Sequence, residues 1–347
     1  MWYRFPVCVA QIFTDWSAMP PAPGLPWASL ILFHWVALCL PFTPRSNAQD
    51  VDLKQTESRL REVVRHLADS IGERNLAKPK ELTEAANYLQ KLLETSSYDV
   101  HRQTFQVHGV DCHNLVAEKI GSTSPKQILL VGAHYDSARG TPGANDNATG
   151  VAALTVIAER LKRAKLAKTV RFVLFANEEP PFFQRDGMMG SWVYARECRK
   201  RNDDIQLVLS LETMGFYTDE PNSQKYPPLI AHLYPSTGNF IGFVGNLSSR
   251  PSLDKVLKAF KQHSSFPAYG ASLPGEIRGV GWSDHWSFWQ EGYSGLMVTD
   301  TALFRYPHYH LPSDTFDKID FERLSKVVDG LAKVIEQLAN TNELENK

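Results

Sequence analysis

Apolar runs and amphipathic stretches alternate along most of the chain, which is typical of a fold that alternates strands and helices. From residue 126 onward, four short runs are almost continuously apolar, and we expect each to form a strand buried on both faces. These runs lie at 128–134, 169–176, 205–211 and 295–300. The pattern predicts the α/β fold class, as a single domain with a mixed, largely parallel central sheet between helices.

The flanking sequence adds elements on both sides of this core. Amphipathic helices are expected at about 52–70 and 81–94, and strand-like segments at 98–107 and 114–120. An amphipathic helix running from about Leu324 to Leu338 closes the chain. A stretch rich in proline, glycine and polar residues at 216–235 is long enough to form a functional loop over a binding crevice.

Side chains that can bind metals follow the predicted strands in one order: His134, Asp146, Glu179, Glu212 and His310. Three of them come at or just after the end of an apolar run. Asp146 lies instead in a glycine-rich loop that opens the next helix near residue 147, and His310 lies in a loop flanked by prolines. In an open α/β sheet the binding crevice lies beyond the carboxyl ends of the strands, so we expect all five to meet there.

Glu178 and Glu179 are neighbours, and adjacent side chains of an extended strand point to opposite faces. Both can therefore serve one site only if the backbone leaves the pleated conformation at that point. Pro180 and Pro181 follow directly, and we expect them to stop the strand and redirect the chain.

Six sequence blocks carry a family resemblance, and they occur in the family's order between about residue 51 and the end. They are Ala-His-Tyr-Asp-Ser at 133–137, Pro-Gly-Ala-Asn-Asp-Asn-Ala at 142–148, Ala-Asn-Glu-Glu-Pro at 176–180, Leu-Glu-Thr-Met at 211–214, Trp-Ser-Asp-His at 282–285 and Tyr-His-Leu-Pro-Ser-Asp-Thr at 309–315. With these blocks the chain resembles the co-catalytic dinuclear zinc aminopeptidases, the bacterial leucyl aminopeptidase-like metallopeptidases. That family also includes glutamate carboxypeptidases and glutaminyl cyclases. The resemblance implies a zinc-dependent exopeptidase-like fold.

The resemblance also implies a role for each ligand candidate. Asp146 would bridge two metal ions. His134 and Glu212 would complete the shell of one ion, and Glu179 and His310 the shell of the other. Position 212 is Glu where the best-known dinuclear aminopeptidases carry Asp, so the carboxylate is kept with one more methylene.

Two further residues would serve catalysis by the same resemblance. Glu178 would be the general base. Asp136 would hydrogen-bond the free ring nitrogen of His134, which is how a ligand imidazole is usually oriented.

The donor types point to metal chemistry. A set of imidazoles and carboxylates without a thiolate suits Zn²⁺, and would also suit Mn²⁺ or Co²⁺. We expect two Zn²⁺ ions per chain, about 3.5 to 4 Å apart as in other two-metal sites. Such a pair would make a hydroxide available at neutral pH and polarise the peptide carbonyl, while Glu178 takes the proton from the water and returns it to the leaving amine.

We therefore expect an exported zinc-dependent exopeptidase, an aminopeptidase that hydrolyses N-terminal peptide bonds. Two alternatives stay open: a glutaminyl-cyclase-like acyltransferase with a single zinc, and a catalytically silent extracellular binding domain on the same fold. Because Glu178 and all five ligand positions are retained, the silent domain is disfavoured, and the number of bound metals would separate the other two. The expected partner is a peptide substrate. The residue removed, the choice between amino and carboxyl ends, and the oligomeric state are left open by the sequence.

The first 48 residues differ in character from the rest. The apolar block 27–42 is shorter than the roughly 20 residues of a membrane span, and a small-x-small site, Ser46-Asn47-Ala48, follows it. We interpret residues 1–48 as a leader, a signal peptide that starts at Met1 or at Met19, and residues 49–347 as a zinc metallopeptidase domain. The expected location is periplasmic or secreted, with no stable membrane span after leader cleavage. An anchor through the apolar block is the alternative.

Composition excludes one class of partner and leaves two local questions open. The formal net charge is −1, without a basic run or a phosphate-binding glycine loop, so nucleic acid is not expected. Cys112 and Cys198 would remain after cleavage, and sequence alone does not decide whether they pair. Asp284 and His285 belong either to the substrate site or to a hydrogen-bonded pair in a helix beneath it. Aromatic residues at 282, 286, 289, 304, 306 and 309 are candidates for an apolar side-chain pocket.

Overall fold

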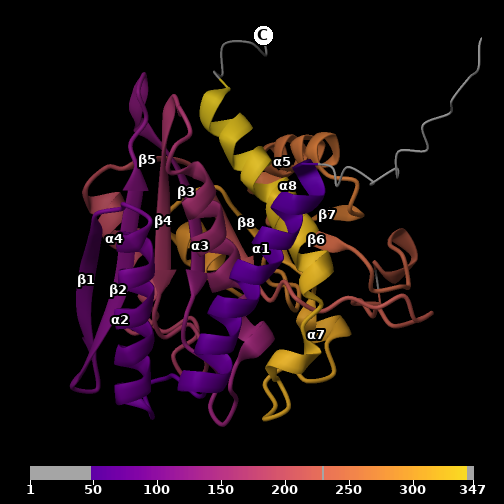
Figure 1. The fold of residues 1–347 in the computed structure, drawn as a ribbon, viewed down its shortest axis with the longest axis horizontal. Coiled ribbons are helices and arrows are strands. Elements are labelled where there is room, and N and C mark those ends of the chain that lie inside the picture. Colours follow the sequence, from indigo (N-terminus) through magenta and orange to yellow (C-terminus); the bar gives the residue numbers. More distant parts are fainter. Residues whose placement is uncertain (1–47, 229, 342–347) are drawn as a thin grey trace, which may run out of the picture. The chain divides into compact units, whose positions relative to one another are not determined.

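In the computed structural model, which describes residues 48–228 and 230–341, eight strands form one sheet (Figure 1). The strands are β1 (Val100–Val107), β2 (Val110–Lys119), β3 (Ser124–His134), β4 (Lys168–Phe175), β5 (Asp204–Glu212), β6 (Ile241–Gly245), β7 (Ala268–Ser272) and β8 (Gly295–Thr299). Across the sheet they run in the order β1-β2-β4-β3-β5-β8-β6-β7. The pairs β4–β3, β3–β5, β5–β8 and β6–β7 are parallel, and β1–β2, β2–β4 and β8–β6 are antiparallel. The predicted mixed, largely parallel sheet is confirmed.

Helices cover both faces of this sheet. One layer consists of α1 (Ala48–Arg65), α2 (Pro79–Thr95), α3 (Gly150–Leu161), α5 (Arg250–His263) and α8 (Phe321–Asn340). Figure 1 shows α1, α3 and α8 side by side in front of the strands. The shorter helices α4 (Gly190–Lys200) and α6 (His285–Gln290) pack against the opposite face. The remaining helical segments are α7 (Ala302–Arg305), the π-helical η1 (His66–Ile71) and η2 (Ala144–Thr149), and the 3₁₀ turns η3 (Ala231–Leu233), η4 (Leu247–Ser249) and η5 (Phe316–Lys318).

Alternate residues of the central strands face two separate cores, as the two-residue period of a strand requires. In β3, Leu129 and Val131 pack with the α1, α3 and α8 layer, whereas Leu130 packs with the α4 and α6 layer. All eight residues of β4 are buried. This double burial explains why the central strands have almost continuously apolar sequences.

The register of β3 and β5 places two polar side chains next to each other. Gly132 of β3 pairs with Ser210 of β5, and both strands continue for two more residues, to His134 and Glu212. Because side chains alternate, these two terminal residues point to the same face as Leu130. The sheet thus delivers a histidine and a glutamate to one spot at its carboxyl edge.

Sequence patterning found most, but not all, of these elements. The predicted helices, strands and closing helix correspond to α1, α2, α8 and to β1 through β5 and β8. It did not identify β6 and β7, which are five residues long and contain glycines, nor α4, α5 and α6. The predicted leader lies almost wholly outside the described residues, and in the part of the chain that the structure describes no helix has the length and apolar character of a membrane span.

Candidate metal centre

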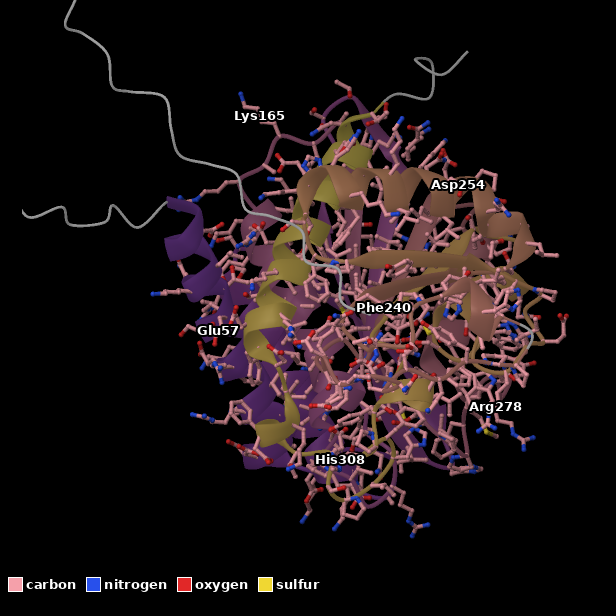
Figure 2. All side chains as sticks on the ribbon, turned by 90° about the vertical axis from the view of Figure 1, so that its right-hand side faces the viewer. Glu57, Lys165, Phe240, Asp254, Arg278 and His308 are labelled. Carbon is pink, nitrogen blue, oxygen red and sulfur yellow. The ribbon has the colours of Figure 1, made fainter. Side chains whose placement is uncertain are left out.

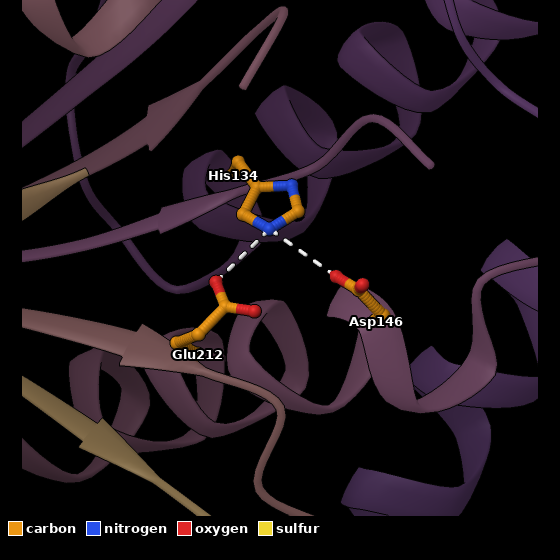
Figure 3. A group of neighbouring side chains, drawn as sticks. All are labelled: His134, Asp146 and Glu212. Carbon is orange, nitrogen blue, oxygen red and sulfur yellow. Dashed lines mark hydrogen bonds and ion pairs between the residues drawn. The ribbon is translucent and has the colours of Figure 1, made fainter. Parts of the chain in front are cut away.

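The five predicted ligand residues gather at the carboxyl edge of the sheet in two groups that share one carboxylate. The first group is His134, Asp146 and Glu212, and the second is Asp146, Glu179 and His310. Figure 3 shows the first group, with the His134 ring between the two carboxylates. Its Nε2 atom lies 3.1 Å from Glu212 Oε2 and 3.4 Å from Asp146 Oδ1.

The second group has the same form around the other oxygen of the shared carboxylate. His310 Nε2 lies 3.2 Å from Asp146 Oδ2 and 3.1 Å from Glu179 Oε2. Each oxygen of Asp146 therefore faces a different imidazole. The arrangement matches the expected bridging role of Asp146, and the roles of the five residues as ligands stay a prediction.

The backbone leaves the strand conformation just before the two glutamates. β4 ends at Phe175, and Asn177 has a φ of 58°. The expected departure from the pleat is present, but it begins at Asn177 and not at the prolines that follow the glutamates. Left-handed backbone is tolerated by asparagine better than by most residues, so the sequence Ala-Asn-Glu-Glu supports this turn.

Asp136 anchors this turn and also faces His134. Its Oδ1 accepts the backbone N–H of Glu178 and its Oδ2 accepts that of Glu179, both at 3.1 Å. Its Oδ1 also lies 3.4 Å from Nδ1 of His134, the ring nitrogen that points away from the ligand cluster. One carboxylate thus fixes the backbone of the Glu178–Glu179 pair and faces the first imidazole.

Glu178 belongs to neither three-residue group. Its Oε2 lies 3.8 Å from His134 Nε2, so its carboxylate stands beside the first group without joining it. Burial raises the pKa of Glu178 well above its ordinary value; His134 opposes this, and the charges of Glu212 and Glu179 add to it. The residue is thus placed next to the cluster with a carboxyl group that holds a proton more readily than an exposed glutamate.

The other carboxylates and the imidazoles show how strongly this cluster attracts positive charge. Burial raises the pKa of Glu212, and it raises that of Glu179 to about 8. Burial acts to lower the pKa of His310, but Asp146 and Glu179 outweigh it and raise the value to about 11. Burial also acts to lower the pKa of His134, but the charges of Glu178 and Glu212 outweigh this effect and raise that pKa well above its ordinary value. Burial would also raise the pKa of Asp146, yet its contacts with the two histidines hold that pKa below the usual range.

The cluster fits a pair of metal ions by its unused polar atoms. Both carboxylate oxygens of Asp146 and both of Glu179 are buried, and apart from the two imidazoles no described residue offers them a hydrogen-bond donor. Buried polar groups are nearly always satisfied, so buried carboxylates whose only neighbours of this kind are two imidazoles fit a bound cation. Imidazole and carboxylate donors are those that Zn²⁺ takes in catalytic sites.

Sequence patterning gave no role to two residues that organise the cluster. Asp314 is fully buried and its oxygens accept the backbone N–H groups of Asn145 and Asp146, at 2.8 and 3.1 Å. Ser283 donates its hydroxyl to Glu212 Oε2 at 2.8 Å. Both lie within sequence blocks that carry the resemblance, and that position was the available signal.

Asp284 and His285 are both buried, but they do not form a pair with each other. His285 Nε2 lies 2.8 Å from the carbonyl oxygen of Val280, and burial lowers its pKa to about 4, which leaves the ring neutral. Asp284 makes no hydrogen bond to His285, and burial raises its pKa to about 7. The hydrogen-bonded pair that the sequence left open is therefore excluded.

An apolar cavity of about 100 Å³ opens beside the first group of ligands. Its wall includes Glu212 and the aromatic residues Trp282, Phe304 and Tyr309. The loop 216–235 contributes Tyr226 and Tyr234, so that loop does border the crevice. Figure 2 shows two more lining residues, Phe240 and Arg278, of which the arginine lies near the edge of the molecule.

Only part of the aromatic cluster expected around this cavity lines it. Trp286 and Trp289 border a separate, more polar cavity together with Trp282, and Tyr306 is buried with its hydroxyl donating to Asp314 at 2.7 Å. Cys112 and Cys198 are both free and buried, and they belong to the cores on opposite faces of the sheet. A disulfide between them is therefore absent.

Comparisons with known proteins identify the family of the chain. The sequence profile described as Peptidase family M28 matches residues 114–335. The uncharacterized protein YfbL of Escherichia coli (strain K12) is 35% identical over 318 residues, which cover 88% of this chain and 94% of YfbL. Aminopeptidase YwaD of Bacillus subtilis (strain 168) is 27% identical over 225 residues, which cover 60% of this chain and 42% of YwaD.

Among solved structures, the fold is similar to that of BSAP, a zinc aminopeptidase from Bacillus subtilis. The TM-score is 0.67 at 14% sequence identity, over 83% of this chain and 96% of that one. Since the family profile spans more than half of the chain and YfbL matches it over nearly its full length, the chain belongs to Peptidase family M28 and is a peptidase.

Proposed function

We propose that the protein is a zinc-dependent aminopeptidase with two metal ions and with Glu178 as its general base. The observation that carries this proposal is the pair of three-residue donor groups that share Asp146. A shared carboxylate with one imidazole facing each oxygen could bridge two neighbouring ions. The relation to Aminopeptidase YwaD supports the choice of the amino end.

In this proposal His134 and Glu212 would hold one ion, Glu179 and His310 the other, and Asp146 both. The ions would supply Lewis acidity and a nucleophilic water at neutral pH. Asp136 would keep the His134 ring oriented through Nδ1, which leaves Nε2 free to act as a ligand.

Glu178 would move the proton. Its carboxylate lies beside the ligand cluster, within 3.8 Å of His134 Nε2, but belongs to neither donor group. Burial and neighbouring carboxylates raise its pKa, which brings the carboxyl group closer to the range where it can both accept and return a proton near neutral pH. The proton would pass from water to a Glu178 oxygen and then to the leaving amine.

Tyr309 is a second side chain suited to the reaction. Its ring stacks on that of His310, with 4.0 Å between centroids, and it lines the apolar cavity beside Glu212. Its hydroxyl makes no hydrogen bond to any described residue, so it can donate to the substrate. A donor aimed at the carbonyl oxygen would stabilise the negative charge that develops there.

The cavity also suggests which residue is removed. Its walls are mostly aromatic and aliphatic, so burying an apolar side chain there would be favourable. We expect Leu and Phe substrates to exceed Asp and Lys substrates in kcat/KM, and a clear preference for charged residues would contradict this part of the proposal.

A substrate panel tests the function as a whole. Aminoacyl, carboxyl-terminal and N-terminal glutaminyl peptides would be offered to the purified protein before metal removal, after chelation and after reloading with Zn²⁺. We expect hydrolysis of aminoacyl peptides that is lost on chelation and restored by Zn²⁺. Release of carboxyl-terminal residues, or cyclisation of glutaminyl peptides with one bound metal, would replace the aminopeptidase by the corresponding alternative.

We also propose that the peptidase is exported and that residues 1–48 are its leader. The apolar block 27–42 and the Ser-Asn-Ala site that follows support this proposal. Mature protein should begin near Gln49. If native material keeps the apolar block at its N-terminus, soluble export is wrong and a membrane anchor is favoured.

A further inference from the structure

Arg74 is a fully buried arginine that lies outside the segment matched by the family profile. Its exposed fraction is 0%, and it sits between η1 and α2, upstream of residue 114. Arginine is rarely buried to this extent without a carboxylate partner. Among the described residues, no carboxylate forms an ion pair with Arg74.

All of its side-chain hydrogen bonds go to backbone carbonyl oxygens. Nε donates to Tyr135 at 2.7 Å, Nη1 donates to Pro142 at 2.5 Å, and Nη2 donates to Gly143 at 2.8 Å. Nη1 also lies 3.2 Å from the carbonyl of Gly72. A planar guanidinium with several fixed donors can join these carbonyls in one geometry, which a single ammonium group cannot do.

The bonded carbonyls flank two of the candidate ligands. Tyr135 directly follows His134, and Pro142 and Gly143 begin the turn that presents Asp146. One side chain therefore ties the end of β3 to the Asp146 loop. The backbone of Arg74 strengthens the tie, because its N–H donates to Ser137 Oγ at 3.1 Å and its carbonyl accepts the N–H of Ser137 at 3.0 Å.

The loop that carries Asp146 is packed closely, so it has little room to adjust if the hydrogen bonds from Arg74 are lost. Gly143 has a φ of 61°, and a Cβ there would lie 2.4 Å from the carbonyl oxygen of Asp146 and 3.2 Å from Nη2 of Arg74. The loop is thus packed closely between Arg74 and the ligand that follows.

The charge of Arg74 also acts on the cluster at longer range. Burial lowers its pKa to about 10, against the opposing effect of Asp136, Asp314 and Asp146, so the guanidinium stays charged at neutral pH. The guanidinium is thus a permanent positive charge close to the buried carboxylates of Asp136, Asp314 and Asp146. Such a charge favours the ionised carboxylates that metal binding needs.

We propose that Arg74 is a positioning residue that sets the separation of His134 and Asp146, and thereby the affinity of the metal site that contains both. This inference rests on the proposed dinuclear site. It concerns metal binding and is testable without any measurement of turnover.

Arg305 provides a matched control, because it is a second buried arginine that binds backbone carbonyls. It donates to the carbonyls of Phe216 and Phe240, at 3.3 and 2.8 Å, and to Gln224 Oε1 at 2.7 Å. These contacts hold the loop 216–240 and do not touch the turn that carries Asp146. Loss of Arg305 should therefore cost fold stability without changing metal affinity.

The experiment is a calorimetric titration of metal-free protein with Zn²⁺, for wild type, Arg74→Met, Arg74→Lys and Arg305→Met, with circular dichroism to establish that each is folded. Wild type should bind two ions. Arg74→Met should bind Zn²⁺ roughly 10- to 100-fold more weakly, the usual effect of losing a residue that orients ligands. Arg305→Met should bind like wild type.

Arg74→Lys covers the case in which Arg74→Met does not fold, since it keeps the charge but cannot span three carbonyls. It should also weaken Zn²⁺ binding by about tenfold or more. Wild-type affinity in a folded Arg74 variant, or an equal loss in Arg305→Met, would overturn the inference. If wild type itself binds no Zn²⁺, the proposed function fails instead.

Discussion

Replacing Glu178 by Gln tests the assignment of the general base with little disturbance of the structure. The substitution keeps the size of the side chain and removes its ability to accept a proton. Asp136 holds the backbone at this position, because it accepts the N–H groups of residues 178 and 179. These hydrogen bonds do not depend on the side chain of residue 178. Because the carboxylate belongs to neither donor group, both ions should remain bound.

The expected loss is in the rate of the chemical step. A positioned general base contributes roughly 10²- to 10⁴-fold, which corresponds to about 3 to 5 kcal/mol of transition-state stabilisation. KM should change little, because the interaction is made in the transition state and not in the ground state. The metal-free fold should be as stable as wild type or more so, since burial raises the pKa of Glu178 and so disfavours its charged form in the folded protein.

The assay combines steady-state kinetics on a Leu peptide, metal analysis of the same sample and thermal unfolding of the metal-free protein. We expect kcat to fall by two to four orders of magnitude with two ions still bound. Loss of metal from the Gln variant would make Glu178 a ligand. Nearly full activity would show that another group accepts the proton.

Two further predictions concern residues near this one. Glu179→Ala removes a carboxylate that faces His310 at 3.1 Å, so metal content and activity should fall together, and retention of both ions would contradict the second donor group. His285 is buried and neutral with a pKa of about 4, below its ordinary 6.5, so the unfolded chain binds a proton between these values that the folded chain does not. The free energy of unfolding should therefore be unaffected by His285 above about pH 6.5. As the pH drops toward 4 it should fall, by roughly 2 kcal/mol between pH 7 and 4.5, because the unfolded chain takes up the proton first. Chemical unfolding of wild type and His285→Gln across this range measures the difference, and equal pH dependence in both would refute it.

The sequence allowed the central sheet and the three candidate ligands at strand ends to be predicted for one physical reason. Strands buried on both faces need continuous apolar runs, and their ends must lie at one edge where polar residues are exposed to a crevice. His134 and Glu212 are therefore recognisable as strand termini without coordinates. Their meeting needs the β3–β5 register as well, which no local pattern contains.

The residues that the sequence did not reveal act through contacts between distant segments. Arg74 binds carbonyls about 60 to 70 positions away, and carbonyl acceptors leave no trace in the amino-acid types. Asp314 likewise binds the Asp146 loop from a distant part of the sequence, by accepting the backbone N–H of Asp146. The sequence suggested that the two prolines after Glu179 redirect the backbone. In the structure the left-handed residue is Asn177, before both glutamates, and asparagine tolerates this conformation.

The short elements β6 and β7 were missed because glycine-containing strands of five residues have neither an apolar run nor a clear alternation. They extend the sheet beyond β8 and form part of the cavity wall through residues such as Val244. The specificity of the site is therefore the part least accessible to sequence patterning, since it depends on two strands and a long loop that pack together.

The central claim is that two metal ions share Asp146, and anomalous diffraction at the zinc edge from crystals of the Zn²⁺-loaded protein tests it most directly. We predict two peaks on opposite sides of the Asp146 carboxylate, one beside His134 and Glu212 and the other beside Glu179 and His310. A single peak, or peaks that do not adjoin Asp146, would contradict the dinuclear site.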